Sequence, residues 1–399
     1  MTQSQPRRPR VFMMDLFATV PYYTAYLAKA LLAQPIDLTV GSISYYLDPS
    51  CFAGRGIKLD PGLFDVVGRF QLPRLPRRIL KMAEGTLNLL ALTVRFLVSP
   101  PEIVHVQFLT LVTSRIPLDL WLVKLCRRRG SKIVLTVHDL LPHDTGLTHR
   151  QVFHKLYHSA DRIICHSDAI KIRLVNEFSL ADSHICVIPH GPFFYDLPAN
   201  KSDTALPAFA TGPEKLLVLW QGIILPYKGV DLLLEAWKHI EAAGADARLL
   251  IVGTGATGLV NAIYQQIGHL NLRHVSFHPH FISSEQLVDV YRSADIVVYP
   301  YRTITTSGAL ATGLALGKTI VASDLPVFRE LLKDRENSLL VAPQDTAALS
   351  TALLELAQDP HLRQQLAERV REMNFGDSSW LLIAEQTARC YQSALNLRP

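Results

Sequence analysis

The segment "PYRTITTSGALATGLALGKTIVASDLP", residues Pro300–Pro326, has the pattern of a strand end, a turn, a helix and a second strand. An apolar strand runs into it at Tyr299, small hydroxyl and glycine residues follow, and then come an alanine-rich helix, a glycine turn and the strand Thr319–Ala322. Units of this strand–turn–helix–strand kind usually hold a ligand at the turn, beyond the carboxyl end of the first strand. From Tyr301 to Ser323 the sequence has no carboxylate. The ligand expected here therefore meets hydroxyl groups and helix N–H groups instead of acids.

The same alternation of short apolar runs with helix-period runs fills the chain twice. The predicted strands are Arg10–Asp15, Asp37–Gly41, Ile103–Phe108, Lys132–Val137, Arg162–His166 and His184–Pro189, then Leu216–Gln221, Arg248–Val252, His274–Phe277, Ile296–Pro300, Lys318–Ala322 and Leu339–Val341. The predicted helices include Thr24–Leu32, Ile116–Arg128, Val230–Ala242, Gly258–Ile267, Ser284–Ser293 and Ala347–Gln358. Such alternation indicates parallel sheets covered by helices on both faces. We therefore expect an α/β protein with two doubly wound parallel-sheet domains that face a cleft, with ligands at the carboxyl ends of the strands.

A stretch rich in Pro, Ala, Ser and Thr separates the two sets of strands and is typical of a linker between domains. It predicts a first domain at residues 1–195, a linker at 196–213 and a second domain at 214–376. A long amphipathic run follows, with Asp377 or Ser378 as the expected N-cap.

Composition excludes several other classes of protein. With 49% hydrophobic residues and a mean hydropathy of +0.17, the 399-residue chain has enough apolar side chains for two buried sheets and too many for a disordered protein. The five cysteines stand singly, so neither a zinc knuckle nor a disulfide framework is expected, and a reducing, cytoplasmic compartment fits best. Neither HExxH nor DxD occurs, and no metal is expected. The first residues lack the apolar core of a signal peptide, and the most apolar window, Leu87–Val98, is too short to span a bilayer.

Positive charge is concentrated in the first half of the chain. Residues 1–195 hold 23 Lys and Arg against 14 Asp and Glu. The excess falls in two runs, "RFQLPRLPRRILK" with Arg69, Arg74, Arg77, Arg78 and Lys81, and "CRRRGSK" with Arg127, Arg128, Arg129 and Lys132. Two interpretations stay open: a solvated helix end with a loop, or a patch for an anionic phospholipid surface, because leucines and prolines interleave with the arginines. Nucleic acid is not expected as a partner, since no aromatic stacking pattern accompanies the charge.

The segment "LLIVGTGATGLVNAI" contains G-x-G-x-x-G at Gly253, Gly255 and Gly258, between a predicted strand and a predicted helix. A dinucleotide site would also need an acidic residue about 20 residues further on. The next acid after Asp246 is Glu285, inside a later predicted helix. A plain tight turn near a nucleotide is therefore favoured over NAD binding.

Five groups of segments run in the order found in glycosyltransferase family 4. They are "PEIVHVQF…IVLTVHDLLPHD…ADRIICHSDAI…ICVIPHG", "VLWQGIILPYKGVDLLLEAW", "LLIVGTG", "SSEQLVDVYRSADIVVYPY" and "ALGKTIVASDLPVFRELLKDRENSLLVAPQD". The chain resembles that family from roughly Arg10 to Tyr391, most clearly over Leu216–Asp345. The resemblance implies a retaining sugar-nucleotide transferase with two Rossmann-like domains, the GT-B architecture. It also implies that a terminal helix, here 377–399, crosses back to the first domain.

The chain departs from the family at two glutamates, whose positions correspond to Ile304 and Thr312. A subset of the family resembles this chain in opening the helix with Ser-Gly, and that subset still binds a diphosphate. The first turn of a helix has unpaired N–H groups and a partial positive charge. Ser307, Gly308 and Ala309 are therefore predicted to receive the anion, and Thr312 to bond a ribose hydroxyl. A small-residue helix packed under a sheet is the structural alternative.

After "WQG" the family usually has an arginine and then Lys-Gly, but here two isoleucines follow Gly222 and only Lys228 remains. The resemblance implies that Lys228 contacts the departing diphosphate beside Gly222 and Gly253 and acts as a catalytic cation. An exposed loop lysine is the alternative. Arg302, at the end of the strand before the phosphate turn, is a candidate for replacing the missing arginine. Asp231 is expected to cap the helix that follows Lys228.

In the first domain, "TVHDLLPHD" ends a strand with His138 and Asp139. The resemblance implies that His138 meets hydroxyls of the transferred sugar, with a capped loop histidine as the alternative. Tyr22 and Tyr23, in "DLFATVPYYTAYLAKAL", are candidates for stacking on an acceptor sugar, with Asp139 as a further acceptor contact. Core packing is the alternative for the two tyrosines.

Residues and resemblance together predict a metal-independent, retaining hexosyltransferase without a cofactor. It would move a sugar from a nucleoside diphosphate donor to a lipid-linked or polysaccharide acceptor by front-face substitution, in the cytoplasm or at the inner membrane face. The first alternative is a catalytically silent, sugar-nucleotide-binding accessory homologue, because two glutamates and an arginine are missing. The second is an NAD-linked oxidoreductase.

Overall fold

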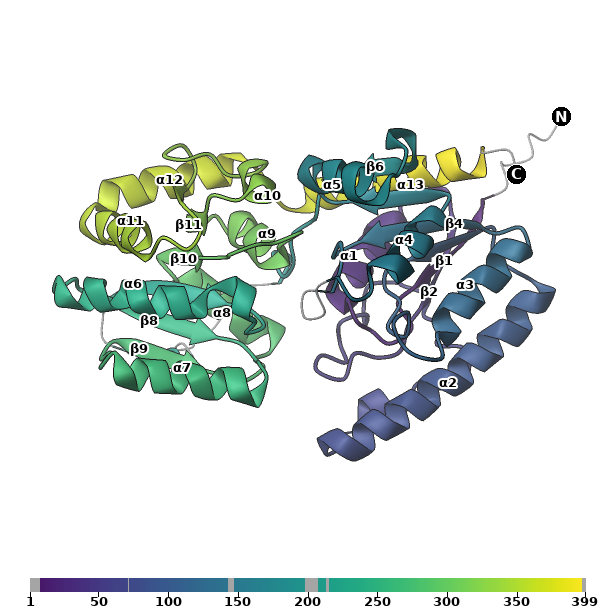
Figure 1. The fold of residues 1–399 in the computed structure, drawn as a ribbon, viewed down its shortest axis with the longest axis horizontal. Coiled ribbons are helices and arrows are strands. Elements are labelled where there is room, and N and C mark those ends of the chain that lie inside the picture. Colours follow the sequence, from purple (N-terminus) through teal and green to yellow (C-terminus); the bar gives the residue numbers. More distant parts are fainter. Residues whose placement is uncertain (1–7, 71, 143–146, 198–206, 213–214, 397–399) are drawn as a thin grey trace. The chain divides into compact units, whose positions relative to one another are not determined.

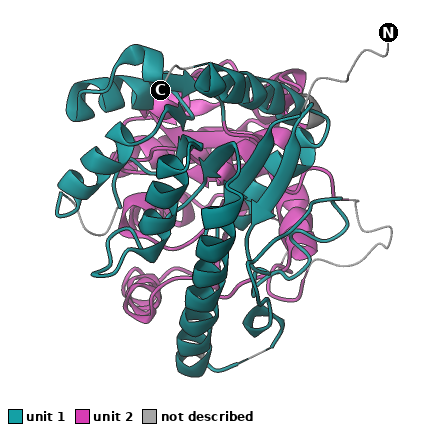
Figure 2. Cartoon of the chain, turned by 90° about the vertical axis from the view of Figure 1, so that its right-hand side faces the viewer, with its two compact units in different colours: residues 1–189, 380–399 teal, residues 190–379 magenta. Residues whose placement is uncertain are grey.

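The computed structural model describes residues 8–70, 72–142, 147–197, 207–212 and 215–396 (Figure 1). The chain divides into two compact units, coloured separately in Figure 2. Unit 1 consists of residues 1–189 and 380–399, and unit 2 of residues 190–379. Residues 198–206 and 213 of the predicted linker lie outside the described residues.

Unit 1 is built on a parallel sheet in the order β2-β1-β3-β4-β5-β6. Its strands are β1 (Arg10–Met14), β2 (Asp37–Gly41), β3 (Ile103–Val106), β4 (Lys132–Val137), β5 (Arg162–Cys165) and β6 (Ile185–Val187). Its helices are α1 (Pro21–Leu31), η1 (Val67–Arg69), α2 (Arg74–Val98), α3 (Leu118–Arg128), α4 (Arg150–His158), α5 (Asp168–Phe178), η2 (Asp182–His184) and α13 (Asp377–Leu395). The strand order reverses between β1 and β3, and the loops after these two strands leave a crevice at such a switch point.

Unit 2 repeats the design with the order β12-β11-β10-β7-β8-β9. Its strands are β7 (Leu216–Gln221), β8 (Ala247–Val252), β9 (Val275–His278), β10 (Ile296–Tyr299), β11 (Thr319–Ser323) and β12 (Leu339–Val341). Its helices are η3 (Pro226–Lys228), α6 (Val230–Ala242), α7 (Thr257–His269), α8 (Ser284–Ser293), α9 (Gly308–Ala315), α10 (Pro326–Arg329), α11 (Thr346–Gln358) and α12 (Pro360–Glu372). Here the switch point lies between β7 and β10. All the strand pairs are parallel, which confirms the predicted fold class.

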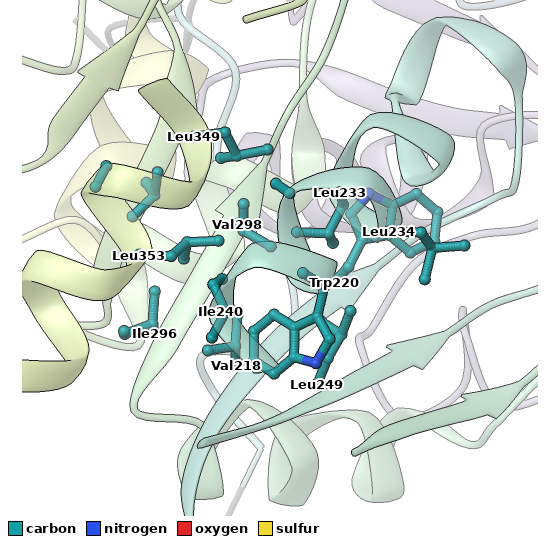
Figure 3. Close-up of a cluster of buried hydrophobic side chains, with 14 of the residues drawn as sticks. Val218, Trp220, Leu233, Leu234, Ile240, Leu249, Ile296, Val298, Leu349 and Leu353 are labelled. Atoms are coloured by element: carbon teal, nitrogen blue, oxygen red, sulfur yellow. The ribbon is translucent and has the colours of Figure 1, made fainter. Parts of the chain in front are cut away.

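The core of unit 2 explains why its sheet is a firm base for a site. Val218, Trp220, Leu249 and Val298 project from neighbouring strands into a cluster of fully buried apolar side chains (Figure 3). Leucines from α6 and α11 close the cluster from the helix side. Each such side chain contributes about 1.5–3 kcal/mol on burial. The carboxyl ends of β7 and β10 are thus fixed from below by close packing.

The helix α13 belongs to unit 1, although unit 2 precedes it in the chain. Trp380 stacks on Tyr26 with ring centroids 5.6 Å apart, and the Tyr391 hydroxyl lies 2.7 Å from Nδ1 of the buried His105. The Arg162 guanidinium donates to the Ser393 hydroxyl at 2.7 Å. The side chains of the expected N-cap residues at 377 and 378 lie outside the described residues.

The two basic runs both lie at a helix end beside a loop: the first leads from η1 into the first turns of the long helix α2, and the second ends α3 at Arg127 and Arg128. Whether either run meets an anionic surface stays a prediction. The inner face of α2 holds Leu89, Leu92 and Phe96, each at most 5% exposed. Its outer face is apolar as well and consists of Leu75, Ile79, Leu80, Met82, Leu87, Leu90, Val94, Leu97 and Val98, which are all exposed. We call these nine residues the α2 apolar face. None of the helices in the described residues combines the length and the apolar character needed to cross a bilayer.

Candidate functional site

The switch point of unit 2 gathers most of the residues predicted for the donor. The loop from Gly222 to Gly229 follows β7, the segment from Pro300 to Ser307 follows β10, and the turn at Gly253 follows β8. The Arg302 N–H donates to the Tyr227 carbonyl at 2.7 Å, which joins the first two loops. The Gly222 N–H donates to the Val252 carbonyl at 3.1 Å and so connects the loop after β7 to the end of β8.

Three glycines let these loops approach one another closely. A Cβ on Gly253 would lie 1.7 Å from the Gly222 carbonyl oxygen, and one on Gly229 would lie 1.9 Å from the Pro300 carbonyl oxygen. All three have positive φ angles, +152° at Gly222, +67° at Gly229 and +151° at Gly253, which side chains disfavour. The surface at this edge is therefore bare backbone. Gly258 differs, because a Cβ there would meet nothing within 4 Å. It lacks the close helix–strand packing that the third glycine of a dinucleotide fingerprint provides.

Lys228 lies at the centre of this arrangement. Its Nζ is 3.0 Å from where a Cβ on Gly222 would stand and 5.8 Å from the centre of the Tyr301 ring. Its carbonyl oxygen accepts from the indole N–H of the buried Trp220 at 3.3 Å. The backbone of Lys228 is thus fixed to the core, and its half-buried ammonium lies beside bare backbone where an anionic group could approach.

The first turn of α9 has the features expected for an anion site. Ser307 is the N-cap, and its hydroxyl accepts from the Leu310 N–H at 3.1 Å. No acidic residue lies in the first turn. The Tyr299 hydroxyl donates to the Ala309 carbonyl at 2.8 Å and holds the helix onto β10. The remaining N–H groups of the turn, at Gly308 and Ala309, follow the cap directly.

A segment that sequence reasoning missed covers part of this helix. A Cβ on Gly308 would stand 2.6 Å from the Phe193 ring and 3.3 Å from the His190 ring. The Phe193 N–H donates to the Thr312 hydroxyl at 3.3 Å, and that hydroxyl donates to the Gly308 carbonyl at 2.8 Å. Glycine is therefore required at 308 because the 190–193 segment packs on it. The Gly191-Pro192 pair is typical of a turn, but nothing local shows where such a turn packs.

The two positions of the missing glutamates are both buried in unit 2. Ile304 is 8% exposed and Thr312 is 2% exposed. A carboxylate at either position would lose its hydration unless a ligand or a cation replaced it. The chain has instead an apolar side chain at 304 and a hydroxyl at 312 that is engaged with backbone groups. The role of Thr312 toward a ribose stays a prediction.

Arg302 is engaged within its own unit. Its guanidinium forms a two-pronged pair with Asp231, at 2.8 and 2.6 Å, and donates to the Pro226 carbonyl at 2.7 Å. The expectation that Asp231 caps its helix is wrong, because the N-cap of α6 is Gly229 and no side chain caps it. The diphosphate role of Arg302 stays a prediction, and it would require Arg302 to share or leave this ion pair.

In unit 1, His138 ends β4 inside a group of aromatic and polar side chains. It is 8% exposed, its Nε2 lies 3.2 Å from the Gln107 amide oxygen and its Nδ1 lies 3.4 Å from Nε2 of His166. Tyr23 is 3% exposed and meets His138 edge-on at 4.8 Å between ring centroids. A ring so enclosed packs in the core, which is the alternative that the sequence left open for Tyr23.

The other two acceptor candidates are more accessible. Tyr22 is half-buried, and its hydroxyl donates to the Asp48 carboxylate at 3.1 Å. Asp139 is also half-buried, directly after His138 at the carboxyl end of β4. Contact of Tyr22, Asp139 or His138 with a substrate stays a prediction. No three His, Cys, Asp or Glu side chains are grouped for a metal ion in the part of the chain that the structure describes.

Two histidines of this unit are buried in their neutral form. Burial lowers the pKa of His166 to about 4 and that of His105 to about 3. Each ring has hydrogen-bond partners that suit a neutral imidazole, such as the Ile188 carbonyl for His166 and the Tyr391 and Thr136 hydroxyls for His105. Burial acts oppositely on Asp15, whose pKa it raises to about 6.

These pKa values predict that unit 1 loses stability as the pH falls below about 6.5. Below pH 6.5 the unfolded chain binds protons at both histidines, whereas the folded chain does not. The stability that is present above pH 6.5 is therefore lost as the pH falls from 6.5 toward the folded pKa values of the two histidines. We expect a loss of roughly 1 kcal/mol per histidine between pH 6.5 and 5.5. Asp15 opposes part of this loss in the same pH window, because its folded pKa of about 6 lies above the ordinary value of 3.8 and the folded state gains stability as it takes up the proton. The gain is roughly 0.7 kcal/mol between pH 6.5 and 5.5.

The measurement is amide hydrogen exchange of β3 and β4 at the two pH values, corrected for intrinsic exchange rates. In a His105→Gln variant, whose amide can bond both hydroxyls, the loss between the two pH values should be smaller by roughly 1 kcal/mol. Equal losses in the two proteins would show that His105 does not titrate on unfolding.

Comparisons with known proteins agree with this fold. A family model described as "Glycosyltransferase Family 4" matches residues 20–191, and one described as "Glycosyl transferases group 1" matches residues 215–359. A phosphatidyl-myo-inositol mannosyltransferase of Mycobacterium leprae is 33% identical over 173 residues, which are 42% of this chain and 44% of that protein. A D-inositol 3-phosphate glycosyltransferase of Rhodococcus opacus is 26% identical over 243 residues, or 59% of this chain and 54% of that protein. The matched regions thus span about half the length of these curated relatives.

Solved structures match nearly the whole chain in fold. A glycosyltransferase from Rickettsia africae has a TM-score of 0.71 at 18% identity, with 98% of this chain and all of that chain covered. HepE from Anabaena, solved in complex with UDP-glucose, has a TM-score of 0.70 at 16% identity, with 97% and 100% covered. At these identities the likeness shows the fold, which is GT-B. The two family models, each over less than half of the chain, and the GT-B fold together support a glycosyltransferase similar to those of family 4.

Proposed function

We propose that the chain is a retaining, metal-independent glycosyltransferase that takes a sugar from a nucleoside diphosphate donor bound at the switch point of unit 2. The observation that carries the proposal is the convergence of the Lys228 ammonium, the acid-free first turn of α9 and the bare backbone at Gly222 and Gly253. An anion meets two sources of positive potential there and no carboxylate within the turn. HepE, which shares the fold, has UDP-glucose bound.

The chemistry assigned to the site is stabilisation of the departing diphosphate. Charge develops on that group as the bond to the sugar breaks, and a preorganised ammonium and helix dipole stabilise it without reorganisation. Retention follows from front-face substitution, in which the leaving phosphate helps to deprotonate the acceptor. No residue is assigned as nucleophile, and His138 is proposed to orient the transferred sugar.

The acceptor is proposed to be lipid-linked or a saccharide. Two relatives are named for phosphatidyl-myo-inositol and for D-inositol 3-phosphate. The α2 apolar face lies beside Arg77, Arg78 and Lys81 on the same helix. Leucines combined with basic residues suit an anionic phospholipid surface, so we propose a cytoplasmic enzyme that contacts the inner membrane face.

The experiment is a thermal-shift panel of nucleoside diphosphates followed by turnover with the matching sugar donors. A ligand at 100 times its Kd should stabilise the protein by about 2.7 kcal/mol. We expect one diphosphate to stand out, turnover to survive EDTA, and the product to keep the donor anomer by NMR. Absence of any shift would refute the donor site, and an inverted product would refute retention.

A catalytically silent homologue is the second candidate, favoured by the burial of Ile304 and Thr312 where glutamates are usual in the family. It would show the same thermal shift but no turnover with any donor.

A further inference from the structure

A cavity lies at the switch point of the unit 1 sheet. The predicted acceptor residues Tyr22, Tyr23 and Asp139 are not among the residues that line it. Its volume is about 260 Å³. Its walls come from three elements that the reversal of strand order brings together, namely the loop after β1, the start of α2 and the loop after β3. The lining residues are Phe17, Ala18, Thr19, Arg78, Lys81, Met82 and Thr110. Ligands of doubly wound sheets bind at such points.

The polar groups of the lining are two cations and two hydroxyls. Lys81 Nζ donates to the Phe17 carbonyl at 2.8 Å, which positions the ammonium at the wall. The Thr19 and Thr110 hydroxyls bond each other at 2.9 Å across the two loops. Among the described residues, neither Arg78 nor Lys81 forms an ion pair with a carboxylate.

Two acids interact electrostatically with Lys81 but do not line this cavity. The Asp15 carboxylate accepts from the Thr19 and Val20 N–H groups at 2.8 and 3.0 Å and is fully buried under the loop. Glu84, one turn beyond Lys81 on α2, accepts from the Val66 N–H at 2.6 Å and is likewise absent from the lining. The lining itself therefore includes two cationic side chains and no carboxylate, within a mostly apolar wall.

The remaining wall is apolar and continues onto the surface. Phe17 and Met82 complete the lining, and Met82 belongs to the α2 apolar face. From there the face runs along the rest of α2 to Val98. A ligand with an anionic head and an apolar extension would match both parts.

We propose that this cavity binds the phosphate group of the acceptor between Arg78 and Lys81. Phosphate matches two converging cations and neighbouring hydroxyl donors, because it offers several charged acceptor oxygens. The inference rests on the proposed function only in naming the ligand an acceptor, since phosphate binding needs no sugar transfer. The phosphate could belong to a soluble monoester or to a phospholipid headgroup, and the experiment separates these sources.

The test measures binding to the full chain without any donor, at constant ionic strength. One arm titrates glycerol 1-phosphate by calorimetry, with glycerol as the neutral control ligand. The other arm sediments the protein with phosphatidylcholine vesicles that contain or lack phosphatidic acid. The variants are Arg78→Gln and Lys81→Gln, and the matched control is Arg128→Gln, which removes an exposed charge of the same unit on α3.

We expect each cavity variant to weaken binding about tenfold or more, because each removes a charge-assisted contact, and the control variant to bind like the wild type. If the wild type binds glycerol 1-phosphate and the cavity variants do not, a soluble phosphate monoester is sufficient for binding. Binding confined to phosphatidic acid vesicles, with the same loss, would identify a lipid phosphate. Arg78→Gln leaves the Lys81–Phe17 hydrogen bond in place, so misfolding would not explain a loss of ligand binding by this variant.

Two results would overturn the proposal: cavity variants that bind both probes as tightly as the control variant, or a wild-type chain that binds neither. The thermal shift with nucleoside diphosphates is measured in parallel. A normal shift with no phosphate binding refutes this site alone, whereas phosphate binding without turnover refutes the proposed transfer alone.

Discussion

Replacing Lys228 with alanine is expected to lower kcat by about 100- to 1000-fold. This corresponds to about 2.7–4 kcal/mol, the usual loss when one preorganised electrostatic contact to a developing negative charge is removed. The reason is local, because the Lys228 ammonium lies over the bare backbone of Gly222. The effect should fall on kcat more than on KM, since the charge on the leaving diphosphate grows toward the transition state. Steady-state kinetics with the donor identified by thermal shift would measure it.

The fold should survive this substitution, because the backbone of Lys228 is held by its carbonyl bond to Trp220. Lys238→Ala is the matched control, as it removes an exposed lysine from α6 in the same unit. If Lys228→Ala turned over like that control, Lys228 would be the exposed loop lysine of the alternative interpretation.

Gly253→Ala should destabilise unit 2 by about 3 kcal/mol or more. The new methyl group would stand 1.7 Å from the Gly222 carbonyl oxygen, and the φ angle of +151° is itself unfavourable for alanine. Backbone strain and overpacking each cost roughly 1–3 kcal/mol. Because the obstacle is backbone of a neighbouring loop, no side-chain rotation relieves it. Urea unfolding followed by the fluorescence of Trp220 and Trp237, both buried in unit 2, would report the change.

The same motif provides the control. Gly258→Ala adds a methyl group where nothing lies within 4 Å, in the first turn of α7. It should be neutral or stabilising by up to about 1 kcal/mol, since alanine is the better helix former. Equal destabilisation by the two substitutions would mean that the close approach of the loops at Gly222 and Gly253 is not maintained in solution.

The strands could be predicted because their signal is local. The run Leu216–Trp220 is apolar throughout, as is typical of strands buried on both faces, and the structure places the predicted strand Leu216–Gln221 at its predicted bounds. The helix α2 was not among the predicted helices, although its sequence is amphipathic. Its start holds Pro73 and Pro76, which are common in loops as well as in a first helical turn, so the sequence did not separate a helix from a loop there.

Only those features of the site that depend on residues close together in the sequence could be predicted. Lys228 and Ser307 follow β7 and β10 and so lie at one edge of the sheet, because parallel strands send their carboxyl ends to the same side. Their contact with a donor stays a prediction. The pairing of Arg302 with Asp231 joins residues 71 positions apart, and the contact of Phe193 with Thr312 joins residues 119 apart. Such pairings depend on how the loops pack, for which the sequence offers no periodic signal.

The return of α13 to unit 1 has a consequence for how the protein is made. His105 is fully buried, and its ring bonds Tyr391, a residue that leaves the ribosome 286 positions later. At about 5–20 residues per second, translation of the 190-residue unit 2 takes roughly 10–40 s. During that interval the nascent unit 1 lacks the helix that covers His105, Tyr23 and Tyr26, while unit 2 can complete its own core as soon as it emerges. The order of folding is thus the reverse of the order of synthesis, and the nascent first unit exposes an apolar surface for chaperones until α13 arrives.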